Sequence, residues 1–190
     1  LICAVMLLCF YEAFGGLHGV VNNAGVNRDR MFASMTEHEW DTIMAVHLKG
    51  HFCITSHAVQ YWRQQSKIGA PVSGRIVNTT SGAGLQGSIG QANYAAAKAG
   101  IAALTLNQAA ELARYGITAN AIAPVARTGM TTAVPEMAAR MAPPSDGGFD
   151  VFAPENVSSL VVWLCSESSG SFTGRILESE GGRLCIAVGW

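Results

Sequence analysis

The chain has 190 residues, of which 49% are hydrophobic and 13% are charged, enough apolar material for one sizeable core and no obvious second one. Its 12 basic and 13 acidic residues give a formal net charge of -1 and form no runs, which excludes the basic face that a nucleic-acid partner requires. The five cysteines lie far apart without a C-x-x-C pair, so a zinc-dependent enzyme is excluded, and free thiols in a reducing, cytoplasmic compartment are expected.

The first ten residues, Leu1–Phe10, form an apolar run. This run has about half the length that spans a bilayer, and it lacks the charged start of a signal peptide. We therefore expect a single domain over residues 1–190, with a buried leading helix within residues 1–16 and a core over residues 17–190, and no membrane partner. Because the first residue is Leu rather than Met, we also expect the natural start to lie further upstream.

Short β-branched runs then alternate with longer segments of helical period, which is the pattern of a parallel sheet covered by crossover helices. The sequence thus predicts an α/β fold. In chain order, the expected strands are Leu17–Asn22, Arg75–Thr80, Thr118–Ala123 and Arg175–Glu178.

Three helices are predicted between these strands. Thr36 can cap the first, with Glu39 three residues later, and apolar positions follow at helical spacing to about Tyr61. The second is expected from about Gln91 to Tyr115, stopped by Gly116, and the third from Pro154 to about Cys165.

The segment Met130–Asp150 is rich in Pro and Gly. We expect it to be irregular and flexible, and it is long enough to be a substrate loop over a site. An inert surface loop is the alternative that its composition leaves open.

Tyr94 and Lys98 are four residues apart on the second predicted helix, so they share one face, about one turn apart. A phenol titrates at about 10, and a neighbouring cation stabilises the phenolate. The pair could therefore exchange a proton with an alcohol or a carbonyl, and Lys98 could also bind a ribose. Because this spacing is frequent by chance on solvated helix flanks, it needs support from other residues.

That support lies at the carboxyl ends of two predicted strands, where ligands gather in an open α/β sheet. Ser81 follows the strand 75–80, and the sequence Asn22-Asn-Ala-Gly25 ends the strand before it. The amides can brace neighbouring strands, while Gly25 allows a close approach. A turn-forming serine and an Asx turn are the alternatives at these two places.

Together, the N-N-A-G sequence at 22–25, Ser81 thirteen residues before the Y-x-x-x-K of Tyr94 and Lys98, and Pro124 after the next strand resemble the short-chain dehydrogenase/reductase family. The resemblance extends from Phe14 to the end of the chain. It implies a Rossmann-like doubly wound parallel sheet, a nicotinamide cofactor, NAD or NADP, and assembly as a homo-oligomer, a dimer or a tetramer.

The resemblance also implies roles for individual residues. Tyr94 would be the general acid/base, Lys98 would lower its pKa and hold the nicotinamide ribose, and Ser81 would orient the substrate carbonyl. The cofactor would be bound by Asn22, Ala24, Gly25, Tyr94 and Lys98, with Pro124, Val125 and Thr128 at the nicotinamide carboxamide.

Two positions depart from the family pattern. Many members carry a catalytic Asn where this chain has His47; His47 would either hold a water in a proton relay or be a packed side chain with no role. The family's P-G-x-x-x-T sequence is one residue shorter here, at residues 124–128, and lacks its Gly.

The family's glycine-rich turn, T-G-x-x-x-G-x-G, would precede Leu1. We therefore expect this chain to hold the catalytic half of the site without the segment that binds adenosine and pyrophosphate. The strand 17–22 would then be an edge, and the isolated chain would be poorly stable and inactive. A non-catalytic oligomerisation scaffold, built on the helices 36–61 and 91–115, is the alternative.

Within the family, four segments most resemble the (3R)-hydroxyacyl-CoA dehydrogenase domain of peroxisomal multifunctional enzymes and their actinobacterial relatives. This resemblance implies an acyl thioester substrate, and a peroxisomal location if the source is eukaryotic. A 3-oxoacyl-(acyl-carrier-protein) reductase is the close alternative. The four segments are Asn27–Phe32, Val46–Gly50, Gln91–Tyr94 and Leu160–Ser168.

Overall fold

The computed structural model describes residues 12–188, arranged around one five-stranded sheet of order β1-β2-β3-β4-β5. Strands β1 to β4 run parallel to their neighbours, and β5 pairs antiparallel with β4. The α/β class and the four predicted strands are confirmed, with small shifts of their ends. Most of the predicted leading helix lies outside the described residues. The strands are β1 Gly19–Asn22, β2 Gly74–Thr79, β3 Ile117–Val125, β4 Ile176–Glu180 and β5 Arg183–Ile186.

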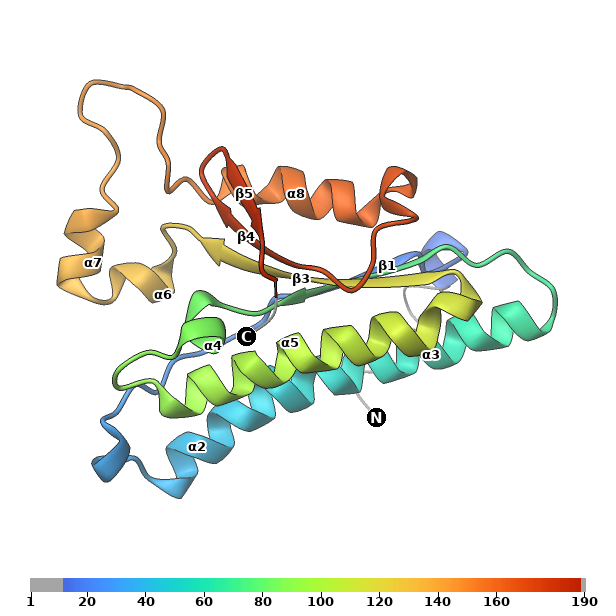
Figure 1. Cartoon of the computed structure of the whole chain (residues 1–190), viewed down its shortest axis with the longest axis horizontal. Helices are drawn as coiled ribbons and strands as arrows, with labels where there is room; N and C mark the ends of the chain where they lie inside the picture. Colours follow the sequence, from blue (N-terminus) through green and yellow to red (C-terminus); the bar gives the residue numbers. More distant parts are fainter. Residues whose placement is uncertain (1–11, 189–190) are drawn as a thin grey trace.

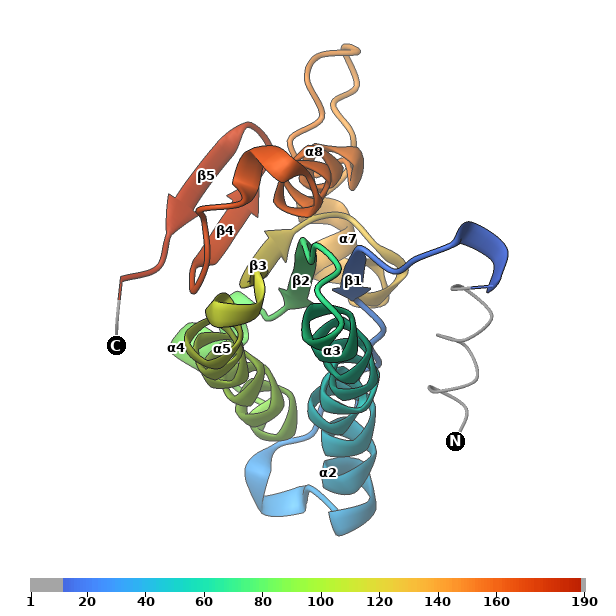
Figure 2. The same ribbon diagram turned by 90° about the vertical axis from the view of Figure 1, so that its right-hand side faces the viewer.

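The helices cover the sheet on both faces, as Figures 1 and 2 show. Helices α3 and α5 lie on one face, and α8 lies on the other. The helices are α2 Glu37–Ile43, α3 Gly50–Lys67, α4 Gly82–Gln86, α5 Ala92–Leu112, α6 Gly129–Thr132, α7 Pro135–Arg140 and α8 Glu155–Cys165. The shorter turns are η1 Phe32–Ser34, the π-helical η2 Met44–Lys49, η3 Ala113–Tyr115 and η4 Glu167–Ser169.

Two apolar clusters hold these layers together. On one face, Trp62 of α3 and Leu112 of α5 pack against Ile76 and Ile117 of the sheet. On the other, Leu160 and Leu164 of α8 pack against Val77, Ile122 and Leu177. Because parallel strands are covered on both faces, successive residues of β2 are all buried, including the adjacent apolar residues Ile76 and Val77.

The helix predicted from Thr36 starts with the expected capping box. The Thr36 hydroxyl accepts from the Glu39 amide at 3.2 Å, and the Glu39 carboxylate accepts from the Thr36 amide at 2.9 Å. The helix does not run evenly to Tyr61, however. It widens into the π-helical segment Met44–Lys49 and then continues as α3 to Lys67, a change of register that apolar periodicity alone does not reveal.

The helix predicted to stop at Gly116 does so. Gly116 has a φ of 75°, a left-handed conformation that glycine adopts without strain. This stop turns the chain directly into β3, whose carboxyl end reaches the candidate site.

The segment Met130–Asp150 is more regular than expected. Thr128 caps α6, and α7 follows with Pro135 in its first turn, a favourable position because its missing amide hydrogen is not needed there. Within this segment, residues 141–150 form no helix or strand.

Strand β5 was not predicted. It follows β4 through Gly181, whose φ is 56°, and its four residues are all exposed. A strand this short and exposed carries little apolar alternation for a sequence pattern to detect. Strand β1 is the other edge of the described sheet.

Over residues 12–188, no helix has both the length and the apolar character needed to cross a membrane.

Candidate active site

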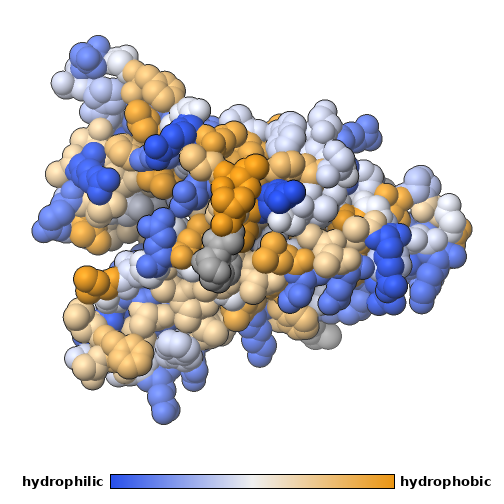
Figure 3. All heavy atoms as spheres, in the orientation of Figure 1, coloured by the Kyte–Doolittle hydropathy of each residue, from blue (hydrophilic) through white to orange (hydrophobic). Residues whose placement is uncertain are grey.

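A cavity of about 510 Å³ lies where β1, β2 and β3 end beside the first turns of α5. In Figure 3 the surface is hollowed on the left, between the part formed by α6 and α7 and the part formed by α4 and the start of α5. Eight predicted site residues line this cavity: Ala24, Gly25, His47, Ser81, Tyr94, Lys98, Pro124 and Thr128.

Lys98 is the buried cation of the site. Its side chain is 3% exposed, and its ammonium donates a 2.6 Å hydrogen bond to the Thr79 carbonyl at the end of β2. The ammonium lies 5.5 Å from the centre of the Tyr94 ring. Burial lowers the pKa of Lys98 to about 8, because the charged form loses hydration.

Tyr94 and Ser81 bring two hydroxyl groups into the cavity. Ser81 caps α4, with its hydroxyl accepting from the Ala83 amide at 3.2 Å, and it also interacts with the Tyr94 hydroxyl. Burial raises the pKa of Tyr94, while the Ser81 hydrogen bond opposes the rise. This corrects the sequence expectation of a lowered pKa, since the Lys98 ammonium is directed at a backbone carbonyl and the loss of hydration dominates.

Close packing of α4 on α5 fixes this part of the wall. The Thr80 hydroxyl donates to the Lys98 carbonyl at 2.6 Å. A Cβ added to Gly84 would lie 2.7 Å from the backbone of Lys98, closer than real Cβ atoms come. Gly84 therefore lets α4 approach the helix that carries both Tyr94 and Lys98.

His47 is a wall residue of the cavity. It lies in the π-helical segment and is 1% exposed. One ring nitrogen, Nε2, is 2.8 Å from the Val26 carbonyl, and the ring meets that of Tyr94 edge-on, with centroids 5.2 Å apart. Burial lowers the pKa of His47, and its other nitrogen, Nδ1, has no hydrogen-bond partner among residues 12–188. His47 is thus both packed and in contact with Tyr94.

Asn22 and Val125 do not line the cavity, contrary to the prediction. Asn22 is the last residue of β1, and its side chain is buried. Its amide donates to Thr55 at 2.8 Å and to Asn78 at 2.9 Å, so it links the end of β1 to α3 and β2. Val125 is 39% exposed because successive strand residues face opposite sides, and its neighbours Pro124 and Ala126 line the cavity instead.

The same alternation brings Asn23 into the site. Asn23 lines the cavity and accepts a 3.3 Å hydrogen bond from the Thr79 hydroxyl. The adjacent residues Asn22 and Asn23 could have predicted this from the sequence, because one of two consecutive residues along an extended chain faces away from the core. Other lining residues that the sequence did not single out are Thr79, Thr80, Ala126, Met130 and Thr131.

The segment before η1 is held against the first turn of α5. Asn93, which is fully buried, donates to the Arg28 carbonyl at 3.1 Å and accepts from the Tyr94 amide at 2.8 Å. The Arg30 amide donates to the Gly90 carbonyl at 2.7 Å. Residues 27–30 are therefore fixed to the start of the helix that carries Tyr94.

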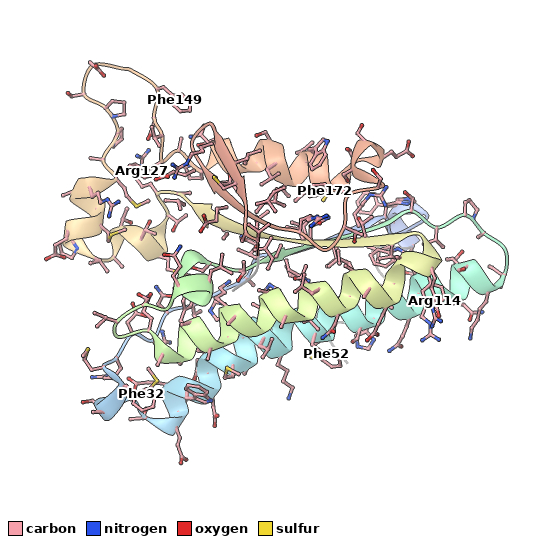
Figure 4. The ribbon with its side chains drawn as sticks, in the orientation of Figure 1. Phe32, Phe52, Arg114, Arg127, Phe149 and Phe172 are labelled. Carbon is pink, nitrogen blue, oxygen red and sulfur yellow. The ribbon has the colours of Figure 1, made fainter. Side chains whose placement is uncertain are left out.

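On the opposite side, Arg127 closes the base of the segment that follows β3. Its guanidinium forms an ion pair with Asp150 and donates to the Met141 carbonyl at 2.7 Å. Figure 4 shows Arg127 below the loop that carries Phe149. The pairing lowers the pKa of Asp150 and keeps both ends of the segment together.

The arrangement suits proton transfer to or from an oxygen atom. A half-buried phenol and a serine hydroxyl face one cavity, and a cation lies behind the phenol. Such a pair can hold an alcohol or carbonyl oxygen and exchange its proton.

Comparisons with known proteins identify similar dehydrogenases and reductases. Residues 7–183 match the protein family described as Enoyl-(Acyl carrier protein) reductase. The chain is 49% identical over 173 residues to hydroxyacyl-CoA dehydrogenase ChsB1 of Mycobacterium tuberculosis, over 90% of this chain and 53% of that protein. It is 38% identical to the peroxisomal multifunctional enzyme type 2 of Mus musculus, over 94% of this chain and 21% of the relative.

Two further matches cover more of the relative. The 3-oxoacyl-[acyl-carrier-protein] reductase FabG of Thermotoga maritima is 37% identical, over 90% of this chain and 68% of that protein. A short chain dehydrogenase from Mycobacterium avium, known from its crystal structure, has a TM-score of 0.87 and 55% identity, over 99% of this chain and 61% of that one.

Proposed function

The chain belongs to the short-chain dehydrogenase/reductase family, and we propose that it acts as an NAD(P)-dependent oxidoreductase that interconverts 3-hydroxyacyl and 3-oxoacyl thioesters. One observation carries the proposal: Ser81 and Tyr94 face one cavity, with the buried Lys98 behind them. Several relatives bear names of hydroxyacyl-CoA dehydrogenases, which supports the substrate class.

In the reductive direction, Ser81 holds the carbonyl oxygen of the substrate and Tyr94 donates the proton to it. Burial favours this role, because it raises the pKa of Tyr94 and keeps the phenol protonated at neutral pH. In the oxidative direction, Tyr94 as phenolate removes the hydroxyl proton while Ser81 keeps the oxygen in place. His47 packs against the Tyr94 ring and limits its movement.

The residues around the cavity fit a nicotinamide ribose. Ala24, Gly25 and Ala126 leave room along one wall, and the polar groups of Asn23, Tyr94 and Lys98 can bind hydroxyl groups. Thr128 would lie near the nicotinamide carboxamide. Bound there, the nicotinamide would accept or supply the hydride.

Coenzyme A is the proposed thioester carrier, and acyl carrier protein is the second candidate because of the similarity to FabG. The two candidates share the same chemistry at Tyr94. They differ in what must bind outside the cavity, so a carrier comparison separates them.

The test is turnover of the purified chain, and of a version that carries the N-terminal nucleotide-binding segment of a relative, with acetoacetyl-CoA and with acetoacetyl-acyl carrier protein. Each substrate is paired with NADH and with NADPH, and the loss of cofactor absorbance is the readout. Calorimetric titration of NADH and NADPH gives the cofactor preference independently. Tyr94→Phe keeps the ring contact with His47 but removes the hydroxyl, and we expect it to lower turnover by about 100-fold or more.

Two results would refute this proposal. Wild-type turnover that Tyr94→Phe leaves unchanged would remove Tyr94 from the reaction. Self-association of the purified protein with neither turnover nor cofactor binding would instead support the non-catalytic scaffold.

A further inference from the structure

His51 is a buried histidine that the proposed mechanism does not use. It lies in α3, one turn after His47, and is 2% exposed. Its Nδ1 donates a 2.7 Å hydrogen bond to the His47 carbonyl, and its Nε2 is 3.4 Å from the Thr79 amide. The ring therefore connects the π-helical segment to the end of β2.

The contacts of His51 lead to both groups that flank Tyr94. The Thr79 carbonyl binds the Lys98 ammonium at 2.6 Å, while the Thr79 amide faces His51. On the other side, His51 holds the backbone of His47, whose ring contacts Tyr94. Displacement of His51 would thus affect the positions of Lys98 and His47 together.

The charge state of His51 fits a fixed link better than proton exchange. Burial first, and the nearby Lys98 cation second, lower the pKa of His51 to about 4. The ring is therefore neutral at physiological pH, with its proton on Nδ1, where the His47 carbonyl accepts it. The charged or polar groups that face it are the Lys98 ammonium, the His47 ring and backbone, the Thr79 amide and the backbone of Asn22.

The π-helical turn explains why such a link is needed. A π-helix is rare because its widened turn is less favourable than an α-helix, and it recurs at functional sites. Here it carries His47 into the cavity wall. The Gly50 amide faces the carbonyls of Ala45 and His47, and the bond from His51 adds a second, buried donor to the His47 carbonyl.

We propose that His51 is a positioning residue, whose ring links the His47 carbonyl to the end of β2 and so keeps the His47 ring and the Lys98 ammonium beside Tyr94. The kinetic consequence rests on the function proposed above. The structural consequence does not.

The structural test is NMR of the protein with isotope-labelled histidines. In the wild type we expect the His51 ring to remain neutral, with its proton on Nδ1, down to below pH 5. His51→Phe keeps a ring of similar size and removes both nitrogens, and we expect it to shift the His47 ring resonances away from their positions beside Tyr94. His51→Asn restores an N–H near the Nδ1 position and should return them toward the wild type.

The kinetic test uses the same variants. We expect His51→Phe to lower kcat by about 10-fold to 100-fold with little change in KM, and His51→Asn to recover most of this loss. The matched control is Thr55→Val, which removes a buried hydroxyl one turn further along α3. This control should lower stability, because Asn22 loses a partner, without moving the His47 resonances.

Either of two NMR results would overturn the proposal: a His51 ring protonated near pH 6.5, or His47 resonances that are the same in the wild type and His51→Phe. The wild-type titration decides even if His51→Phe does not fold. If the NMR results are as expected but the wild type has no turnover, the proposed function fails and the positioning role of His51 stands.

Discussion

Gly25 and His47 fit together so closely that a Cβ added to Gly25 would lie 2.6 Å from His47 Cε1. His47 cannot move away easily, because its ring is buried against Tyr94 and its Nε2 is held at the Val26 carbonyl. A side chain at position 25 would therefore collide with His47 in its present position. This relationship gives the first prediction.

Gly25→Ala should lower both stability and activity by displacing His47. Overpacking of a buried site costs about 1–3 kcal/mol, and the displaced ring would no longer hold Tyr94. The double variant Gly25→Ala/His47→Ala should regain stability, because the clash is gone, but not activity. Chemical denaturation and turnover of the wild type and the two variants measure this, and a double variant that is no more stable than Gly25→Ala would contradict it.

Lys98→Met should stabilise the protein at pH 7 while abolishing turnover. Burial lowers the pKa of Lys98 from 10.5 to about 8, which corresponds to a cost of roughly 3 kcal/mol at neutral pH. Methionine removes this cost but leaves the Thr79 carbonyl without its donor, at about 1 kcal/mol. We therefore expect a net gain of about 2 kcal/mol in the free energy of unfolding.

The pH dependence checks the origin of this gain. Between about pH 8 and 10.5, the unfolded chain binds a proton at Lys98 that the folded chain does not, so wild-type stability rises with pH in this window. The advantage of Lys98→Met should shrink from pH 7 to pH 10. Denaturation curves at both values test it, and an advantage independent of pH would show that the charge of Lys98 is not the cause.

The direction of the reaction should depend on pH through Tyr94. Because burial raises the pKa of Tyr94, the phenolate needed for oxidation becomes more abundant as the pH rises toward that pKa, whereas the phenol needed for reduction is present throughout the neutral range. We expect kcat for oxidation to rise from pH 6 to 9 and kcat for reduction to change less. Initial rates in both directions measure this, and an oxidative rate that falls over the same range would argue against Tyr94 as the base.

Substitution of Asn22 should affect mainly stability, and substitution of Asn23 should affect mainly cofactor binding. Asn22→Ala removes the donor to the Thr55 hydroxyl and to the Asn78 Oδ1, and we expect it to lower the free energy of unfolding by about 1–3 kcal/mol with little change in cofactor affinity. Asn23→Ala, on the cavity wall, should show the reverse. Denaturation and cofactor titration of both variants provide the comparison, and a loss of affinity confined to Asn22→Ala would restore the original assignment.

The sequence predicted the sheet well because parallel strands are buried on both faces and appear as continuous β-branched runs. It also predicted which residues meet at the cavity, since Ser81, Tyr94 and Lys98 all lie at strand ends or on the helix beside them. The Thr36 capping box and the stop at Gly116 followed from local chemistry, which a short segment is enough to specify.

What the sequence did not reveal depends on contacts between distant segments. The π-helical turn at His47 and the hydrogen bonds of His51 form only when α3 packs against the end of β2. The raised pKa of Tyr94 likewise reflects burial by the whole site rather than its spacing from Lys98. Asn22 was assigned to the cofactor because sequence alone did not show which of two adjacent amides faces inward.

The ion pair between Arg127 and Asp150 gives the last prediction. Arg127 directly precedes the segment 128–150, pairs with Asp150 at its far end and donates to the Met141 carbonyl between them. Asp150→Asn should weaken this closure, so that amide hydrogen exchange in residues 142–149 becomes faster and the KM for the thioester rises several-fold, with kcat less affected.

Asp146→Asn is the matched control, because Asp146 is exposed in the same loop and accepts from the nearby Gly148 amide. Since pairing with Arg127 lowers the pKa of Asp150, the closure is present at neutral pH and is lost only as the pH falls through that lowered pKa. Equal exchange rates in Asp150→Asn and Asp146→Asn would show that the ion pair does not control the loop.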